Sequence, residues 1–109
     1  MAIIWTKNAV DELTEIVSQE KYNMGKSPAR NLYLRIKAKM ERINIKPGLQ
    51  EVMPEMVDIG FNHIYQAAES PWVIAYKIEN KTICVLSIIN VGKELDEILY
   101  NKFLEGKIV

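Results

Sequence analysis

The chain has 109 residues, 49% of them hydrophobic and 26% charged, which fits one globular domain that folds without disulfides or metals. Its single cysteine, Cys84, excludes an internal disulfide, and its single histidine, His63, excludes a His/Cys metal cluster. No apolar run approaches the roughly 20 residues of a membrane span, and the N-terminus lacks a signal-peptide pattern. We therefore expect a cytoplasmic protein with no metal, no organic cofactor and no membrane partner.

The formal net charge is zero, but the charges are unevenly distributed along the chain. Residues 27–47 hold six basic side chains and one acidic side chain, whereas the rest of the chain holds eight basic and thirteen acidic residues. A basic segment in a neutral chain still permits a local anionic partner.

The first expected elements are a short strand at residues 3–5, at or near the edge of a sheet, and a helix. Thr6 suits the N-cap of this helix, and Gly25 is a natural terminator. The apolar residues of the helix recur at helical spacing and give one buried stripe, formed by Ala9, Val10, Leu13, Ile16 and Val17.

A second helix is predicted to start at Ser27 as the N-cap, with Pro28 in the first helical position, and to run to about Asn44. Its apolar face comprises Ala29, Leu32, Ile36, Met40 and Ile43. Beside this face runs a basic stripe with three- and four-residue steps, formed by Arg35, Lys39, Arg42 and Lys46. The two helices predict an antiparallel helical hairpin, in which the stripe either complements the acidic first helix or meets an anionic surface.

Residues 49–60 show no clean period and contain Pro54, so we expect an irregular connection that can include a helical turn. Residues 62–68 alternate between polar and apolar side chains, which predicts a strand on which His63 and Tyr65 share one face. His63 is then either a general base or, as an isolated histidine more commonly is, a surface or packed residue.

Two apolar runs, residues 72–78 and 82–89, flank a polar break at residues 79–81. Both runs are rich in β-branched and aromatic residues, which predicts an antiparallel hairpin. Neither run alternates cleanly, so both faces should be covered, and the hairpin should form the centre of the sheet. A helical stripe at residues 95–103 then predicts a short terminal helix.

This order of elements resembles the RelE/ParE toxins of bacterial type II toxin–antitoxin modules. The resemblance rests on Ile3-Ile4-Trp5-Thr6 with Ala9 and Leu13, on Pro54-Glu55 before a strand, on residues 75–78 before a tight turn, and on residues 85–89 leading into Val91-Gly92-Lys93. It implies one α+β domain over residues 1–109. The domain would have an N-terminal strand, an antiparallel helical hairpin packed on a small, mainly antiparallel sheet, and a short C-terminal helix.

The family contains two activities. RelE-like members are similar to ribosome-dependent endoribonucleases that cut messenger RNA with arginine, lysine and a late tyrosine, whereas ParE-like members poison DNA gyrase. Here Lys93 and Tyr100 match the family pattern, but Val73 and Glu94 stand where the family usually has arginine. In the strand before the hairpin, Ile64 and Gln66 likewise stand where the resemblance predicts cations, which weakens the ribonuclease hypothesis.

The tail at residues 94–104 resembles the ParE-type ending, so the resemblance favours a gyrase poison over an enzyme. It implies target-binding residues on the tail and on the basic stripe, namely Lys93, Tyr100, Lys102, Arg35, Lys39 and Arg42. The alternative is a ribosome-dependent ribonuclease acting on mRNA, with Lys93, Tyr100 and His63 as its catalytic candidates. A third possibility, motivated by the missing arginines, is an attenuated toxin or a non-toxic structural module.

Either toxin reading implies a cognate antitoxin with a disordered segment that folds on the toxin and masks its charge. An apolar groove between the helical hairpin and the sheet, or beside the terminal helix, would suit such a segment. The sequence leaves open which groove is used, and whether the toxin forms a homodimer or a hetero-oligomer with its antitoxin.

Overall fold

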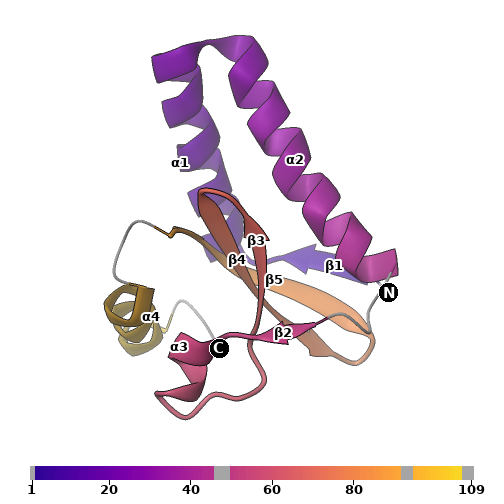
Figure 1. Ribbon diagram of the computed structural model, residues 1–109, viewed down its shortest axis with the longest axis vertical. Helices are drawn as coiled ribbons and strands as arrows, with labels where there is room; N and C mark the ends of the chain where they lie inside the picture. The colour runs from indigo at the N-terminus through magenta and orange to yellow at the C-terminus, as the bar shows by residue number, and fades with distance from the viewer. Residues whose placement is uncertain (1, 46–49, 92–94, 107–109) are drawn as a thin grey trace.

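The chain folds into a five-stranded sheet with helices on both faces (Figure 1). The structure is a computed structural model, which describes residues 2–45, 50–91 and 95–106. The sheet order is β1-β5-β4-β3-β2, in which β1 runs parallel to β5 and the other pairs are antiparallel. The elements in chain order are β1 (Ala2–Trp5), α1 (Lys7–Met24), α2 (Lys26–Ile45), β2 (Glu51–Val52), α3 (Pro54–Val57), β3 (Tyr65–Glu69), β4 (Trp72–Glu79), β5 (Thr82–Asn90) and α4 (Leu95–Leu104).

The hairpin of β4 and β5 forms the centre of the sheet, as predicted. Its turn is Asn80-Lys81, with φ angles of 50° and 59°, and Glu79 pairs with Thr82 on either side. Two successive residues with positive φ match the right-handed twist of the strands, so this tight turn closes the hairpin without splaying it. The predicted edge position of β1 is also confirmed.

Two apolar cores lie on opposite faces of this hairpin, because successive strand residues point to opposite sides. Ile74 and Tyr76 of β4 pack with α1 and α2, whereas Val73 and Ala75 face the other way. The helical-hairpin core comprises Ala9, Leu13, Leu32, Ile36, Met40, Ala67, Ile74, Tyr76, Ile83, Val85 and Ile88. The opposite core comprises Met53, Met56, Ile64, Val73, Ala75, Leu86, Ile89 and Leu99. The prediction that both faces are covered is therefore confirmed.

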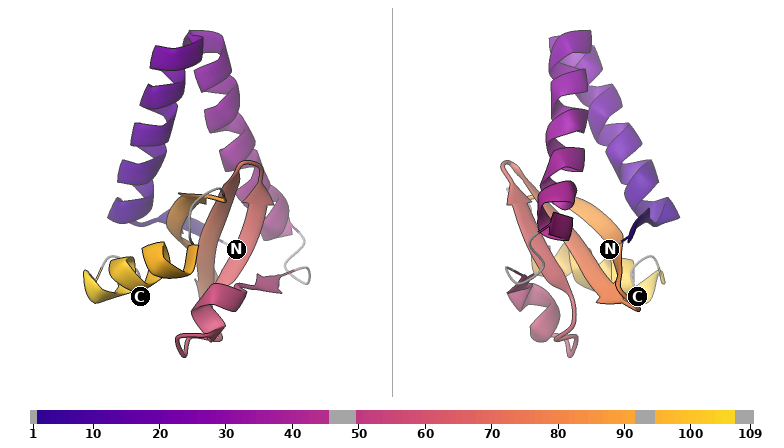
Figure 2. Two further views of the ribbon diagram at one scale, coloured as in Figure 1. Left: turned by 60° about the vertical axis from the view of Figure 1, so that its left-hand side comes forward. Right: turned by 90° about the vertical axis from the view of Figure 1, so that its right-hand side faces the viewer.

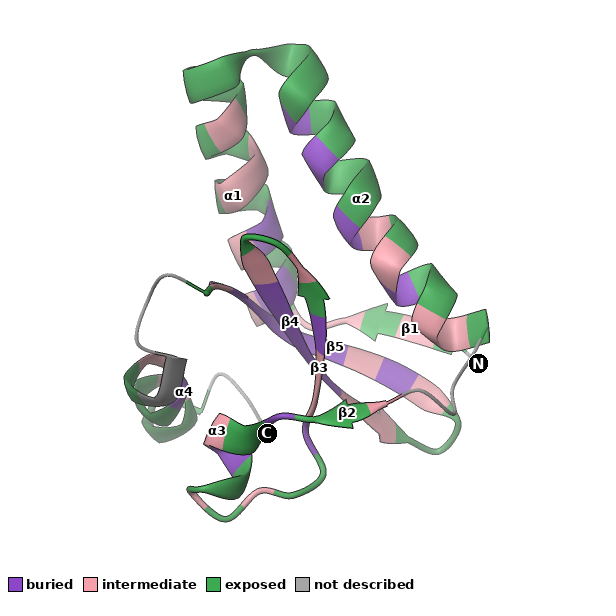
Figure 3. Ribbon diagram, viewed as in Figure 1, coloured by how far each residue is buried: buried purple, intermediate pink, exposed green. Residues whose placement is uncertain are grey.

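The helical hairpin stands on the sheet and its tip projects beyond it (Figure 2). Thr6 caps α1 as predicted, since its hydroxyl accepts a hydrogen bond from the Ala9 amide at 3.2 Å. Residues 21–28 at the tip are all exposed (Figure 3). None of the described helices is both long enough and apolar enough to cross a membrane.

The predicted start of the second helix is wrong by two residues. Gly25 is the single residue between the helices: its amide donates to Lys21 O, and its carbonyl accepts from Ala29 N. Its φ of 97° is easy only for glycine, so Gly25 ends α1 and begins α2 at once. Ser27 therefore lies inside α2 and is not its N-cap.

The strand predicted over residues 62–68 is also wrong at its start, because β3 begins at Tyr65 and His63 lies in the preceding connection. The expected helical turn is present as α3, but the two-residue strand β2 before it has no detectable sequence period. Pro54 has no amide hydrogen and begins α3, so β2 ends at Val52. The ladder of β2 with β3 then has only Glu51 and Val52 as partners, for Gln66 and Tyr65.

Candidate functional site

The predicted target-binding residues fall in two separate places. Arg35, Lys39 and Arg42 lie on α2, whereas Tyr100 and Lys102 lie on α4, which packs on the opposite face of the sheet (Figure 1). Lys93 and Glu94, as well as Lys46, fall outside the described residues. The expected target surface therefore divides into an α2 region and an α4 region.

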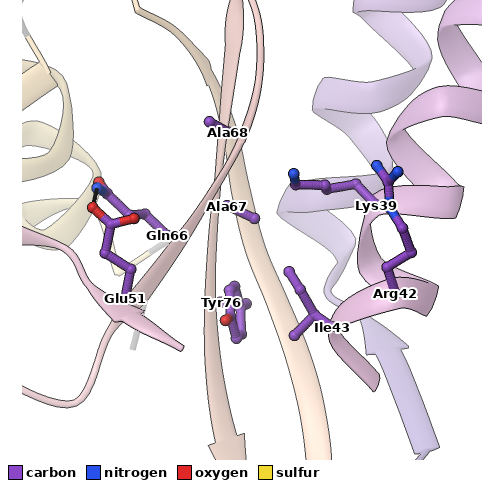
Figure 4. A pocket seen from close by; sticks show the side chains of 8 residues that line it. All are labelled: Lys39, Arg42, Ile43, Glu51, Gln66, Ala67, Ala68 and Tyr76. Atoms are coloured by element: carbon purple, nitrogen blue, oxygen red, sulfur yellow. Dashed lines mark hydrogen bonds between the residues drawn. The ribbon is translucent and has the colours of Figure 1, made fainter. Parts of the chain in front are cut away.

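A pocket of about 440 Å³ opens between the C-terminal half of α2 and strand β3 (Figure 4). We call it the basic pocket; it is lined by Lys39, Arg42, Ile43, Glu51, Gln66, Ala67, Ala68 and Tyr76. The Lys39 side chain extends from α2 toward Ala67 and Ala68 on β3. Ala67 faces α2 and leaves room that a larger side chain would fill, whereas the Ala68 methyl group points to the other side of β3 (Figure 4).

Glu69 at the end of β3 neutralises part of the basic stripe. The Arg35 Nε to Glu69 Oε1 distance is 3.6 Å, and the Arg42 Nη2 to Glu69 Oε2 distance is 3.8 Å. The Glu69 side chain is 20% exposed, whereas the two arginines are 53% and 67% exposed. Among the described residues, the ion-pair partner of the basic stripe is therefore Glu69 of the sheet and not an acidic residue of α1, which was one of the two expected alternatives.

Tyr76 forms the floor of the basic pocket and is 1% exposed. Burial, together with the nearby Tyr65 and Glu51, raises the pKa of Tyr76 to about 12. Its hydroxyl therefore stays protonated at neutral pH and is a hydrogen-bond donor facing a space that also holds Lys39 and Arg42. On the side of β3 away from Lys39 and Arg42, the Gln66 amide donates to the Glu51 carboxylate at 3.0 Å (Figure 4).

A second polar cluster lies where α1 meets β5 and α4. Glu12 Oε1 accepts hydrogen bonds from the Ser87 hydroxyl at 2.8 Å, the Ile88 amide at 3.2 Å and the Asn8 side chain at 3.0 Å. Glu12 Oε2 pairs with the Lys102 ammonium of α4. The Glu12 side chain is only 19% exposed, so this carboxylate is both well sheltered and fully supplied with donors.

The edge of β5 explains why Glu12 is needed there. Strand β1 pairs with β5 only as far as Trp5 opposite Val85, so β5 continues past the end of its neighbour. Side chains from the start of α1 replace the missing strand: Asn8 Nδ2 donates to Leu86 O at 2.8 Å, and Glu12 accepts from the next free amide. The sequence pattern did not single out Glu12, and its i, i+4 spacing from Asn8 was the one signal that could have linked the two residues.

Lys102 is a sheltered ion-pair partner in the structure, with a side chain 16% exposed. The outer face of α4 instead presents Tyr100, Phe103 and Leu104, which are 49%, 36% and 63% exposed. The assignment of Tyr100 and Lys102 to target binding stays a prediction, with Tyr100 the more accessible of the two.

His63 is exposed in the connection before β3, and it is brought near α4 by an aromatic contact. The Phe61 ring lies 5.8 Å from the His63 ring and 4.8 Å from the Phe103 ring, both edge-to-face. Phe103 is one turn from Tyr100 on α4. Two of the three ribonuclease candidates therefore lie at the same end of the molecule, and the third, Lys93, lies outside the described residues.

The sheet face under α4 is apolar where the ribonuclease reading would place cations. Val73, which stands at a usual arginine position, is 8% exposed and packs in the core with Leu99 of α4. Ile64 is 1% exposed in the same core. In the described part of the chain, no three His, Cys, Asp or Glu side chains are placed to hold a metal ion.

The comparisons with known proteins agree with this architecture. The profile of one family, the ParE toxin of the type II toxin–antitoxin system parDE, matches residues 3–95. No curated protein matches the chain in sequence. A solved chain described as "Chromosomal ParDE TA system from P. aeruginosa" has the same fold, with a TM-score of 0.68 over 83% of this chain and 95% of that chain at 16% identity. The expected resemblance and α+β fold are confirmed, and the chain belongs to the ParE toxin family of type II toxin–antitoxin systems.

Proposed function

We propose that this toxin arrests bacterial growth by binding and inhibiting DNA gyrase in the cytoplasm, and that a cognate antitoxin neutralises it. The observation that carries the proposal is the ParE family match over residues 3–95, on a chain with the ParDE fold. The apolar sheet face beneath α4 supports a binding role over RNA cleavage. Cleavage needs cations to stabilise the phosphorane, and Val73 and Ile64 stand at two of the positions where they would be expected.

The outer face of α4 is the surface we assign to the target. Tyr100, Phe103 and Leu104 expose apolar area on one short helix, and the Lys102–Glu12 pair holds that helix against the sheet. A contiguous exposed apolar patch with a rigid support is typical of a protein interaction site. The helix is thus presented to a partner without needing to be ordered first.

The antitoxin segment has a suitable groove on the helical hairpin. An apolar pocket of about 400 Å³ lies between β1, α1 and α2, and its lining includes Trp5, Val10, Leu13, Val17 and Tyr33. Lys37 lies over the Trp5 ring at 4.8 Å and closes one side. An amphipathic helix from the antitoxin would bury its apolar face here, as helix-in-groove complexes do.

Purified protein and gyrase test the proposal directly. We expect the toxin to inhibit supercoiling of a relaxed plasmid, and Tyr100→Ala to weaken inhibition about tenfold or more, since it removes an exposed aromatic anchor. Tyr22→Ala is the matched control, because Tyr22 is 88% exposed at the tip of the helical hairpin, far from α4. Supercoiling that persists at high toxin excess would contradict the proposal.

Expression of the toxin alone in bacteria separates the candidate functions. A gyrase inhibitor should give relaxed plasmid with intact transcripts, and co-expression of the antitoxin should restore growth. Transcripts cut at translated codons, with normal supercoiling, would instead establish the ribosome-dependent ribonuclease. Continued growth would indicate an attenuated toxin.

The ribonuclease alternative has one observation in its favour, which is the approach of His63 to α4 through Phe61. If it holds, Tyr100→Phe and His63→Gln should each reduce transcript cutting, because each removes a group able to move a proton. Undiminished cutting in both variants would remove these two residues from the mechanism.

A further inference from the structure

The basic side chains of α2 beside the basic pocket outnumber the carboxylate that pairs with them. Arg35 and Arg42 of α2 pair with Glu69 at the end of β3, whereas Lys39 of the same helix has no ion pair among the described residues. Both pairing distances, 3.6 and 3.8 Å, exceed the usual N–H···O range of about 2.7–3.2 Å. Among the described residues, neither guanidinium makes a side-chain hydrogen bond, so their N–H donors remain available to a closer acceptor.

The shape of the pocket suits a single carboxylate on a short aliphatic stem. Ala67 and Ile43 form apolar walls, and the protonated Tyr76 hydroxyl adds a donor at the floor. Such a site can bury the methylene groups of an acidic side chain while Lys39 and Arg42 meet its charge, as charge-assisted hydrogen bonds require. Glu69 meets the charge of Arg35 and Arg42 from within the chain, at longer distances.

The same surroundings disfavour a nucleic-acid backbone. Glu51 pairs with Gln66 on the side of β3 away from Lys39 and Arg42 (Figure 4), so the cationic area beside the pocket is confined to α2. Outside residues 27–47 the chain has eight basic and thirteen acidic residues, so the extended positive surface that a polyanion needs is lacking. A point contact with one carboxylate requires no such surface.

We propose that the basic pocket binds a glutamate or aspartate side chain of the cognate antitoxin. This inference rests on the proposed function for the identity of the partner. The pocket and the apolar groove between β1, α1 and α2 use different faces of α2, so one antitoxin segment that wraps this helix would contact both. The contact would fix the register of that segment by charge, while the groove supplies apolar burial.

The pocket is tested first with small probes on the full-length toxin. ¹⁵N-labelled protein is titrated with N-acetyl-glutamate amide, with N-acetyl-glutamine amide and with inorganic phosphate, and the amide shifts of Ala67 and Ala68 are followed. We expect saturable shifts with the glutamate probe and binding about tenfold weaker with the glutamine probe, because the charge-assisted bonds are lost. Equal binding of both amides, binding of phosphate alone, or no shift with any probe would overturn the proposal.

Binding of the antitoxin to toxin variants then tests whether the antitoxin is the partner of this pocket. Lys39→Gln with Arg42→Gln should weaken antitoxin binding about tenfold or more, and the loss should shrink as salt rises. Arg30→Gln is the matched control, being an exposed cation on the same helix outside the pocket. Unchanged affinity in the double variant, with a folded amide spectrum, would overturn the assignment of the antitoxin. The growth-arrest and supercoiling assays test the toxin activity separately, so failure of the one is distinguishable from failure of the other.

Discussion

Two carboxylates, Glu12 and Glu69, are almost equally exposed, at 19% and 20%, yet their surroundings differ. Glu12 has four donors, including a backbone amide, and its ion-pair partner Lys102 is 16% exposed. Glu69 lies between two largely exposed arginines, at distances beyond hydrogen-bond range.

The difference shows that the setting of an ion pair, rather than its presence, decides its role. A sheltered carboxylate with every acceptor site used holds elements together, because removing any partner leaves a buried polar group unsatisfied. A loosely held carboxylate between exposed cations contributes little stability, and leaves donors for a ligand. We therefore regard the Glu12 cluster as structural and the α2–β3 region as the proposed site for the antitoxin carboxylate.

The largest effect should follow from Glu12→Ala. The substitution leaves the buried Ser87 hydroxyl, the Ile88 amide and the Lys102 ammonium without their acceptor, so we expect the free energy of unfolding to fall by about 3–5 kcal/mol. Urea unfolding measures it. Glu15→Ala, an exposed acid on the same helix, should change stability by less than about 0.5 kcal/mol. If both variants lose a similarly small amount of unfolding free energy, the Glu12 cluster is not structural and the contrast with Glu69 fails.

The next largest effect should be a pH dependence of stability that comes from Tyr76, whose pKa is raised to about 12. A raised folded-state pKa means that the folded protein favours the neutral phenol, so this contribution is fully present below pH 10.0 and is lost as pH rises toward about 12. We expect Tyr76 to account for about 2–3 kcal/mol of alkaline destabilisation. Stability measured against pH in wild type and Tyr76→Phe isolates it from other groups. If wild type and Tyr76→Phe lose stability equally as pH rises, the Tyr76 hydroxyl is hydrated in the folded protein and its pKa is not raised.

A double-mutant cycle on Glu12 and Lys102 should give a coupling of about 1–3 kcal/mol, since both side chains are sheltered from water. The control cycle uses Lys7 and Asp11, whose 2.8 Å ion pair is 89% and 62% exposed. There we expect about 0.3–0.5 kcal/mol, as for other exposed pairs four residues apart in a helix. Equal couplings in the two cycles would mean that shelter does not separate these ion pairs.

The smallest effect should come from Glu69→Gln, which we expect to destabilise the fold by less than about 1 kcal/mol. The reason is that Arg35 and Arg42 are 53% and 67% exposed and remain hydrated when their partner is neutralised. Urea unfolding at low and high salt measures the change. A loss as large as that of Glu12→Ala would make Glu69 a structural residue and remove the contrast.

Local patterns in the sequence determined most of the fold. The β-branched runs at residues 72–78 and 82–89 predicted the central hairpin, and helical spacing predicted the buried stripe of α2, because both patterns report which side chains leave water. The cationic residues of the basic pocket were likewise visible as a stripe. Errors arose where the signal was too short, as in the two-residue strand β2, or where one glycine served two helices.

The tertiary structure alone decided which of these residues act together. Three of the four donors to Glu12 come from residues 75 to 90 positions away in the chain, and Glu69 meets α2 only after β3 joins the sheet. Composition and periodicity carry no information about such pairings, because they measure the burial of each side chain and not the identity of its neighbour. The separation between a structural carboxylate at the edge of β5 and a binding pocket beside β3 is therefore a property of the folded chain.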